Sequence, residues 1–131
     1  MKLLREILYK VEINSVVGST SLSINKIEFD SRLISDGDMY IAISGVNVDG
    51  HSFISQAIQN GANCIVCEKI PDNKTDGVVY VNVKSSRKAL SIISSNYFDN
   101  PSSKLNLIGV TGTNGKTTIA TLLFDLYTEL E

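Results

Sequence analysis

The 131-residue sequence has little net charge and no apolar stretch long enough to cross a membrane. Its 12 basic and 14 acidic residues are interspersed and leave a net charge of −2, so we expect no basic surface for nucleic acid or an anionic membrane. The apolar N-terminus is interrupted by Arg5, Glu6 and Lys10 before it reaches the length of a signal peptide. These absences predict a cytoplasmic protein that neither binds nucleic acid nor enters a membrane.

Cysteine and histidine are also scarce, with two residues of the first and one of the second. Cys64 and Cys67 form a C-x-x-C pattern inside a strand-like segment, where residues three apart point to opposite faces. We expect buried, unreactive thiols instead of a metal or redox pair. His51 precedes an expected helix and has no visible catalytic partner in the sequence, so we expect a solvated or capping residue and not a catalyst.

Residues 1–98 combine helix-like and strand-like patterns without an internal repeat. Apolar spacing predicts three helices, over residues 1–11, about 52–60, and from 85 or 86 to about 97. Apolar and β-branched runs predict four strands, at residues 24–29, 39–43, 63–68 and 78–83. The pattern predicts one compact α/β domain.

The second expected helix and the segment that follows the third give two further predictions. In the second helix, Phe53, Ile54, Ala57 and Ile58 are expected to face the core, with Gly61 as a left-handed stop. The polar segment 99–104 contains Pro101 and is expected to be a linker at a domain boundary.

Residues 105–130 predict a buried strand, a glycine-rich turn and an amphipathic helix in succession. Gly112 and Gly115 allow the turn to bring backbone N–H groups close to an anion, and Lys116 adds a positive charge. Thr117 offers a hydroxyl to Mg²⁺ at the start of the helix. This pattern predicts a phosphate loop, although Val110 stands where the common G-x-x-x-x-G-K-[ST] pattern has glycine.

One strand and one helix cannot enclose a core of their own. A phosphate-loop domain also needs further parallel strands and a downstream acidic residue that helps to hold Mg²⁺. We therefore expect the chain to be the front part of a longer enzyme, and by itself neither to turn over ATP nor to bind it tightly.

The segment Thr111-Gly112-Thr113-Asn114-Gly115-Lys116-Thr117-Thr118 resembles the ATP loop of the Mur ligases, the ATP-dependent amino-acid ligases of peptidoglycan synthesis. Motifs in the first half of the chain support the same resemblance. They are Asp30-Ser31-Arg32, Asp36-Gly37-Asp38-Met39-Tyr40-Ile41-Ala42 and Asp49-Gly50-His51-Ser52-Phe53-Ile54, which look like the N-terminal domain of the MurE type. The resemblance implies a mixed-sheet, substrate-binding α/β domain over residues 1–98. The first strand, P-loop and helix of an incomplete ATP-binding domain would follow over residues 105–131.

The resemblance also implies two sets of site residues. UDP-muramoyl substrate would be contacted by Phe29, Ser31, Val46, Asn47 and Val48, with Asp49 and Gly50 shaping the loop. ATP would be held by Gly112, Thr113, Asn114, Gly115, Lys116, Thr117 and Thr118, with Lys116 as the catalytic residue and Thr117 as a ligand of Mg²⁺.

The implied enzyme is a monomeric ligase that adds meso-diaminopimelate or L-lysine to UDP-N-acetylmuramoyl-L-alanyl-D-glutamate through an acyl phosphate. Activation of this kind gives the carboxylate a good leaving group before the amine attacks. Thr113-Asn114 followed by two threonines favours this type over the MurF type, which adds D-alanyl-D-alanine. A non-catalytic UDP-sugar-binding module and an unrelated phosphate-loop GTPase or kinase would each account for part of the pattern.

Overall fold

The computed structural model describes residues 1–104, 112 and 115–130. The chain divides into two compact units, Met1–Pro101 and Ser102–Glu131. The second unit contains α4 (Lys116–Leu130), which confirms the helix predicted after the glycine-rich turn. The buried strand predicted before this turn, at residues 107–110, lies outside the described residues. None of the helices described is both long and apolar enough to span a membrane.

The first unit is built on a mixed five-stranded sheet, which confirms the α/β prediction. The strands follow the spatial order β2 (Ile13–Val17), β7 (Val79–Val83), β6 (Cys64–Cys67), β5 (Met39–Ile41) and β4 (Ile27–Glu28). β4 to β7 are parallel, whereas β2 runs antiparallel to β7 at one edge. The carboxyl ends of four strands therefore meet at one edge of the sheet.

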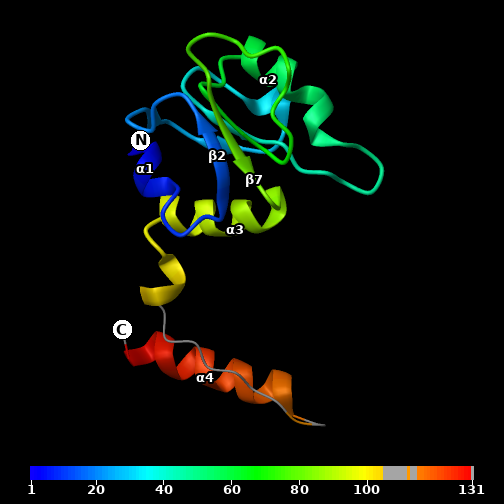
Figure 1. The fold of residues 1–131 in the computed structure, drawn as a ribbon. Helices are drawn as coiled ribbons and strands as arrows, with labels where there is room; N and C mark the ends of the chain where they lie inside the picture. Colours follow the sequence, from blue (N-terminus) through cyan, green and yellow to red (C-terminus); the bar gives the residue numbers. More distant parts are fainter. Residues whose placement is uncertain (105–111, 113–114, 131) are drawn as a thin grey trace. The chain divides into compact units, whose positions relative to one another are not determined.

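Helices cover both faces of this sheet. α1 (Leu4–Ile7) and α3 (Ser86–Tyr97) pack on one face, and α2 (Ile54–Gln59) packs on the other (Figure 1). Short 3₁₀ turns occupy Ser31–Leu33, Gly50–Phe53 and Pro101–Lys104. The helix predicted to start at residue 85 or 86 is capped by Ser85, whose hydroxyl accepts a hydrogen bond from the backbone N–H of Lys88.

Successive side chains of the central strands point to opposite faces of the sheet, and they form a separate core on each face. In β7, Val79, Val81 and Val83 pack towards α1 and α3, whereas Tyr80 packs towards α2. The same period of two sends Met39 and Ile41 to the first face and Tyr40 to the second. The central strands are thus buried on both faces.

The N-terminal region differs from its prediction. Only Leu4–Ile7 is helical, because Lys2–Leu3 forms β1, which pairs with β3 (Ser23–Ile24) in a separate two-stranded sheet. The strand predicted at residues 24–29 is consequently split between this small sheet and β4. β2 was not predicted, because its exposed edge position gives Ile13–Val17 no regular apolar alternation.

The second helix forms where it was predicted, but one of the residues expected to face the core does not. Ile54 and Ala57 are buried, and Gly61 has the expected positive φ of +112°. Phe53, in contrast, is 38% exposed, because it ends a 3₁₀ turn before α2 begins. Its side chain is therefore not part of either core.

The two cysteines are buried on opposite faces of β6, as predicted, with Cys64 in one core and Cys67 in the other. Burial raises the pKa of both thiols, that of Cys67 to about 11. We expect neither thiol to react with Ellman's reagent at pH 8 in the folded protein, and both to react in urea. Rapid modification of either thiol under native conditions would contradict their assignment as packing residues.

Candidate functional site

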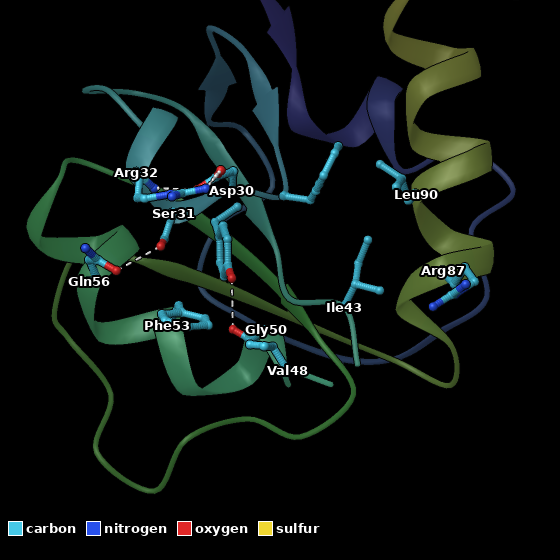
Figure 2. A pocket seen from close by; sticks show the side chains of 12 residues that line it. Asp30, Ser31, Arg32, Ile43, Val48, Gly50, Phe53, Gln56, Arg87 and Leu90 are labelled. Carbon is cyan, nitrogen blue, oxygen red and sulfur yellow. Dashed lines mark hydrogen bonds and ion pairs between the residues drawn. The ribbon is translucent and has the colours of Figure 1, made fainter. Parts of the chain in front are cut away.

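A pocket of about 670 Å³ opens at the carboxyl edge of the parallel strands (Figure 2). Its wall combines the segment after β4, the end of β5, the Gly50–Phe53 turn and the first half of α3. The lining residues are Phe29, Asp30, Ser31, Arg32, Tyr40, Ile43, Val48, Gly50, Phe53, Gln56, Arg87 and Leu90. Ligands of open α/β sheets bind at this edge, and the volume matches that of small-molecule sites.

Asp30 and Arg32 form an ion pair on one side of the pocket. The Asp30 carboxylate accepts hydrogen bonds from Nε and Nη2 of Arg32 at 2.9 and 2.7 Å, and from the Arg32 backbone N–H at 3.0 Å. The last bond caps the 3₁₀ turn that starts at Ser31. The pair therefore stabilises the turn and neutralises the charge of Arg32 at the pocket wall.

The Arg32 side-chain hydrogen bonds, with its backbone N–H, lower the pKa of Asp30 to about 2. Because the carboxyl is more acidic than in an unfolded chain, the pair stabilises the fold above about pH 4 and loses this contribution as the pH falls towards 2. We expect the Asp30 carboxyl carbon to titrate near pH 2 by NMR, and Arg32→Gln to raise this midpoint. An unchanged midpoint in Arg32→Gln would show that the Arg32 side chain does not lower the pKa of Asp30.

Ser31 is only 5% exposed, and it connects the pocket to α2. Its hydroxyl donates a hydrogen bond to Oε1 of Gln56 at 2.9 Å, and its carbonyl accepts one from the Asn60 side chain at 2.8 Å. The hydroxyl and the Gln56 amide thus form an oriented polar group in the pocket wall. Such a group can bind the polar edge of a ligand.

The floor of the pocket depends on the approach of Gly50 to the end of β5. The Gly50 N–H donates to the Ile43 carbonyl at 2.8 Å, and the Tyr40 hydroxyl donates to the Gly50 carbonyl at 2.8 Å. A Cβ at position 50 would lie 2.7 Å from both the backbone nitrogen and oxygen of Ile43, so only glycine fits. Burial raises the pKa of Tyr40, which keeps its hydroxyl a donor.

Asp49 and His51 hold the loop between β5 and α2. Oδ1 of Asp49 lies 2.7 Å from Nδ1 of His51, and Nε2 of His51 accepts the Glu68 backbone N–H at 2.9 Å. An accepting Nε2 requires the proton on Nδ1, so His51 donates to Asp49 as a neutral ring. The expectation of a solvated or capping histidine is thus wrong: Asp49 caps the turn, and His51 ties it to the end of β6.

The residues predicted to contact substrate divide into two groups. Phe29, Ser31, Val48 and Gly50 line the pocket. Val46, Asn47 and Asp49 do not: Val46 and Asn47 are exposed in the loop before the turn, and Asp49 supports that loop through its bonds to His51 and Ser44. Contact between these three residues and a ligand stays a prediction.

Several lining residues were not predicted. Tyr40 and Gln56 come from a strand and a helix whose inner faces were recognised only as core, and Arg87 and Leu90 come from α3. Arg87 could have been found from its place, because it lies in the first turn of the helix that follows a parallel strand, where ligand contacts concentrate.

The second unit contains the residues predicted to hold ATP. Gly115 has a φ of +77°, and a Cβ there would meet nothing within 4 Å. Lys116, Thr117 and Thr118 open α4 with exposed side chains. Thr113 and Asn114 lie outside the described residues. A left-handed glycine followed by an exposed lysine at the start of a 15-residue helix fits a bound triphosphate.

Comparison with known sequences gives matches over nearly the whole chain. The family model described as "Mur ligase family, catalytic domain" matches residues 23–98. This chain is also similar to proteins named UDP-N-acetylmuramoyl-L-alanyl-D-glutamate--2,6-diaminopimelate ligase. That of Cytophaga hutchinsonii is 49% identical over 97% of the chain, and that of Bacteroides thetaiotaomicron is 43% identical over 95%. The chain spans about a quarter of the length of these relatives, 26% in both cases.

Comparison with solved structures gives the related D-alanyl-D-alanine-adding ligases. The UDP-N-acetylmuramoylalanyl-D-glutamyl-2,6-diaminopimelate--D-alanyl-D-alanyl ligase of Acinetobacter baumannii matches 89% of this chain, and 26% of its own, with a TM-score of 0.65 and 25% identity. MurF of Thermotoga maritima, solved with ADP, matches 72% of this chain and 21% of its own, with a TM-score of 0.52 and 32% identity.

Proposed function

Because the chain belongs to the Mur ligase family, we propose that it supplies the uridine-nucleotide site and the phosphate loop of a peptidoglycan-precursor ligase. The reaction proposed is the ATP-dependent addition of 2,6-diaminopimelate to UDP-N-acetylmuramoyl-L-alanyl-D-glutamate in the cytoplasm. The names of the relatives at 40–49% identity support this amino acid over D-alanyl-D-alanine.

The observation that carries the proposal is the pocket at the carboxyl edge of the sheet. Four of the residues implied by family resemblance, Phe29, Ser31, Val48 and Gly50, meet there although they come from separate segments. The exposed ring of Phe29 offers a flat face, and Ser31 with Gln56 offers polar atoms. A planar base with a polar edge matches both features, and a uracil ring is such a base.

ATP and Mg²⁺ would be held by the second unit, by Gly112 to Thr118 with Thr117 as the Mg²⁺ ligand. ATP would supply the phosphoryl group that activates the substrate carboxylate. The residues of this chain would hold and orient the two substrates. Its backbone N–H groups and Lys116 would orient the phosphates, while the pocket of the first unit would hold the uridine end of the other substrate.

We expect UDP to shift the NMR signals of the pocket residues, and Phe29→Ala to weaken UDP binding about tenfold, since base–aromatic stacking contributes about 1–3 kcal/mol. Phe29 is 62% exposed, so its loss should leave the thermal midpoint nearly unchanged. Phe98→Ala is the matched control, because Phe98 is 65% exposed and lies outside the pocket.

Cytidine and adenosine diphosphates complete this test. A pocket that selects uridine should bind both more weakly than UDP. Equal affinity for all three nucleotides, or shifts confined to residues outside the pocket, would contradict the proposal.

A further inference from the structure

Arg87 is the second residue of α3 and forms part of the pocket wall. Figure 2 shows it across the pocket from Asp30, Ser31 and Arg32. Its side chain is exposed, and its Nη2 donates one long hydrogen bond, at 3.5 Å, to the Ser44 carbonyl. A guanidinium has five N–H donors, so that of Arg87 keeps hydrogen-bonding capacity for another group.

The two arginines of the pocket differ in charge balance. Arg32 is held on two nitrogens by the Asp30 carboxylate. Arg87 forms no ion pair with any carboxylate in the part of the chain that the structure describes. The lining residues of the pocket thus carry one uncompensated positive charge, and it lies at the α3 end.

Other groups near Arg87 do not replace it as an anion contact. The Glu68 carboxylate already accepts a hydrogen bond from the Ser86 backbone N–H at 2.9 Å, so this N–H at the start of α3 is not available to an anion. Lys84 and Lys88 line a different cavity, together with Lys10 and Glu12. An anion inside the pocket would therefore contact the Arg87 guanidinium.

We propose that Arg87 binds the diphosphate of the uridine nucleotide. This inference rests on the proposed function, because it assumes that the base lies at the Phe29 end of the pocket. A diphosphate joins the nucleoside to its sugar and carries adjacent negative oxygens, which a guanidinium contacts with two parallel hydrogen bonds. The pocket then has an aromatic end for the base and a cationic end for the phosphates.

The test compares uridine with UDP in NMR titrations of the whole chain. In the wild type, UDP is expected to bind at least tenfold more tightly than uridine. Arg87→Gln should remove most of this difference while leaving the affinity for uridine unchanged. Arg87→Lys should retain part of it, since an ammonium keeps the charge but not the paired geometry.

Lys88→Gln is the matched control, because it removes the same charge from the adjacent residue, whose side chain lines the other cavity. Its affinity for UDP should stay within twofold of the wild type. The inference would be overturned by UDP affinity unchanged in Arg87→Gln, or by an equal loss in Lys88→Gln. A wild type that binds neither uridine nor UDP would instead refute the proposed function itself, and this inference with it.

Discussion

Replacing Gly50 with alanine is expected to lower the free energy of unfolding by about 3 kcal/mol. The new Cβ would lie 2.7 Å from two backbone atoms of Ile43, which cannot rotate away as a side chain could. Relief of this contact must separate the turn from β5. That movement breaks the hydrogen bond from the Gly50 N–H to Ile43 and the one from the Tyr40 hydroxyl to the Gly50 carbonyl.

Urea denaturation, followed by far-UV circular dichroism, measures this loss. Gly77→Asn is the control, because a Cβ at Gly77 would meet nothing within 4 Å and asparagine tolerates the φ of +82° found there. We expect the control to cost less than about 1 kcal/mol. If Gly50→Ala unfolded at the wild-type urea concentration, the close approach of the turn to β5 would be wrong.

Replacing Lys116 with alanine is expected to lower ligase turnover by about 10³-fold, since loss of one charged donor to a reacting phosphate removes about that much. Lys116 is the first residue of α4 and follows the left-handed Gly115, and its side chain is exposed. Without it, the proposed loop would keep backbone N–H groups but lose its point charge for the phosphates.

This measurement needs a ligase of the relatives' length that carries the present chain, with ADP release as the readout. Lys104→Ala is the control, because Lys104 lies before α4, in the Pro101–Lys104 turn and outside the proposed loop. Turnover of Lys116→Ala within twofold of Lys104→Ala would refute the phosphate-loop assignment.

The central strands and the longer helices were predictable because their signals are local. Val79–Val83 and Cys64–Cys67 are rich in apolar residues, and their alternation assigns each side chain to a face. Ser85 at the start of α3 and Gly61 after α2 are signals of the same kind, since each meets a backbone requirement at its own position.

The elements that were wrong or missing depend on distant partners. Lys2–Leu3 is extended because Ser23–Ile24 pairs with it, and Ile13–Val17 becomes a strand because β7 supplies its hydrogen bonds. His51 was misjudged for the same reason. Its partner Glu68 lies 17 residues later and reaches it only because β6 ends beside the Gly50–Phe53 turn.

The sequence by itself determined the α/β class, the resemblance to the ligase family and the kinds of side chain available for a nucleotide. Only the tertiary structure decided that Phe29, Gln56 and Arg87 share one pocket, and that, among the residues described, a carboxylate pairs with Arg32 and none pairs with Arg87. The physical reason is that alternation and capping act within a few residues, whereas a pocket is made when parallel strands bring the ends of distant segments to one edge.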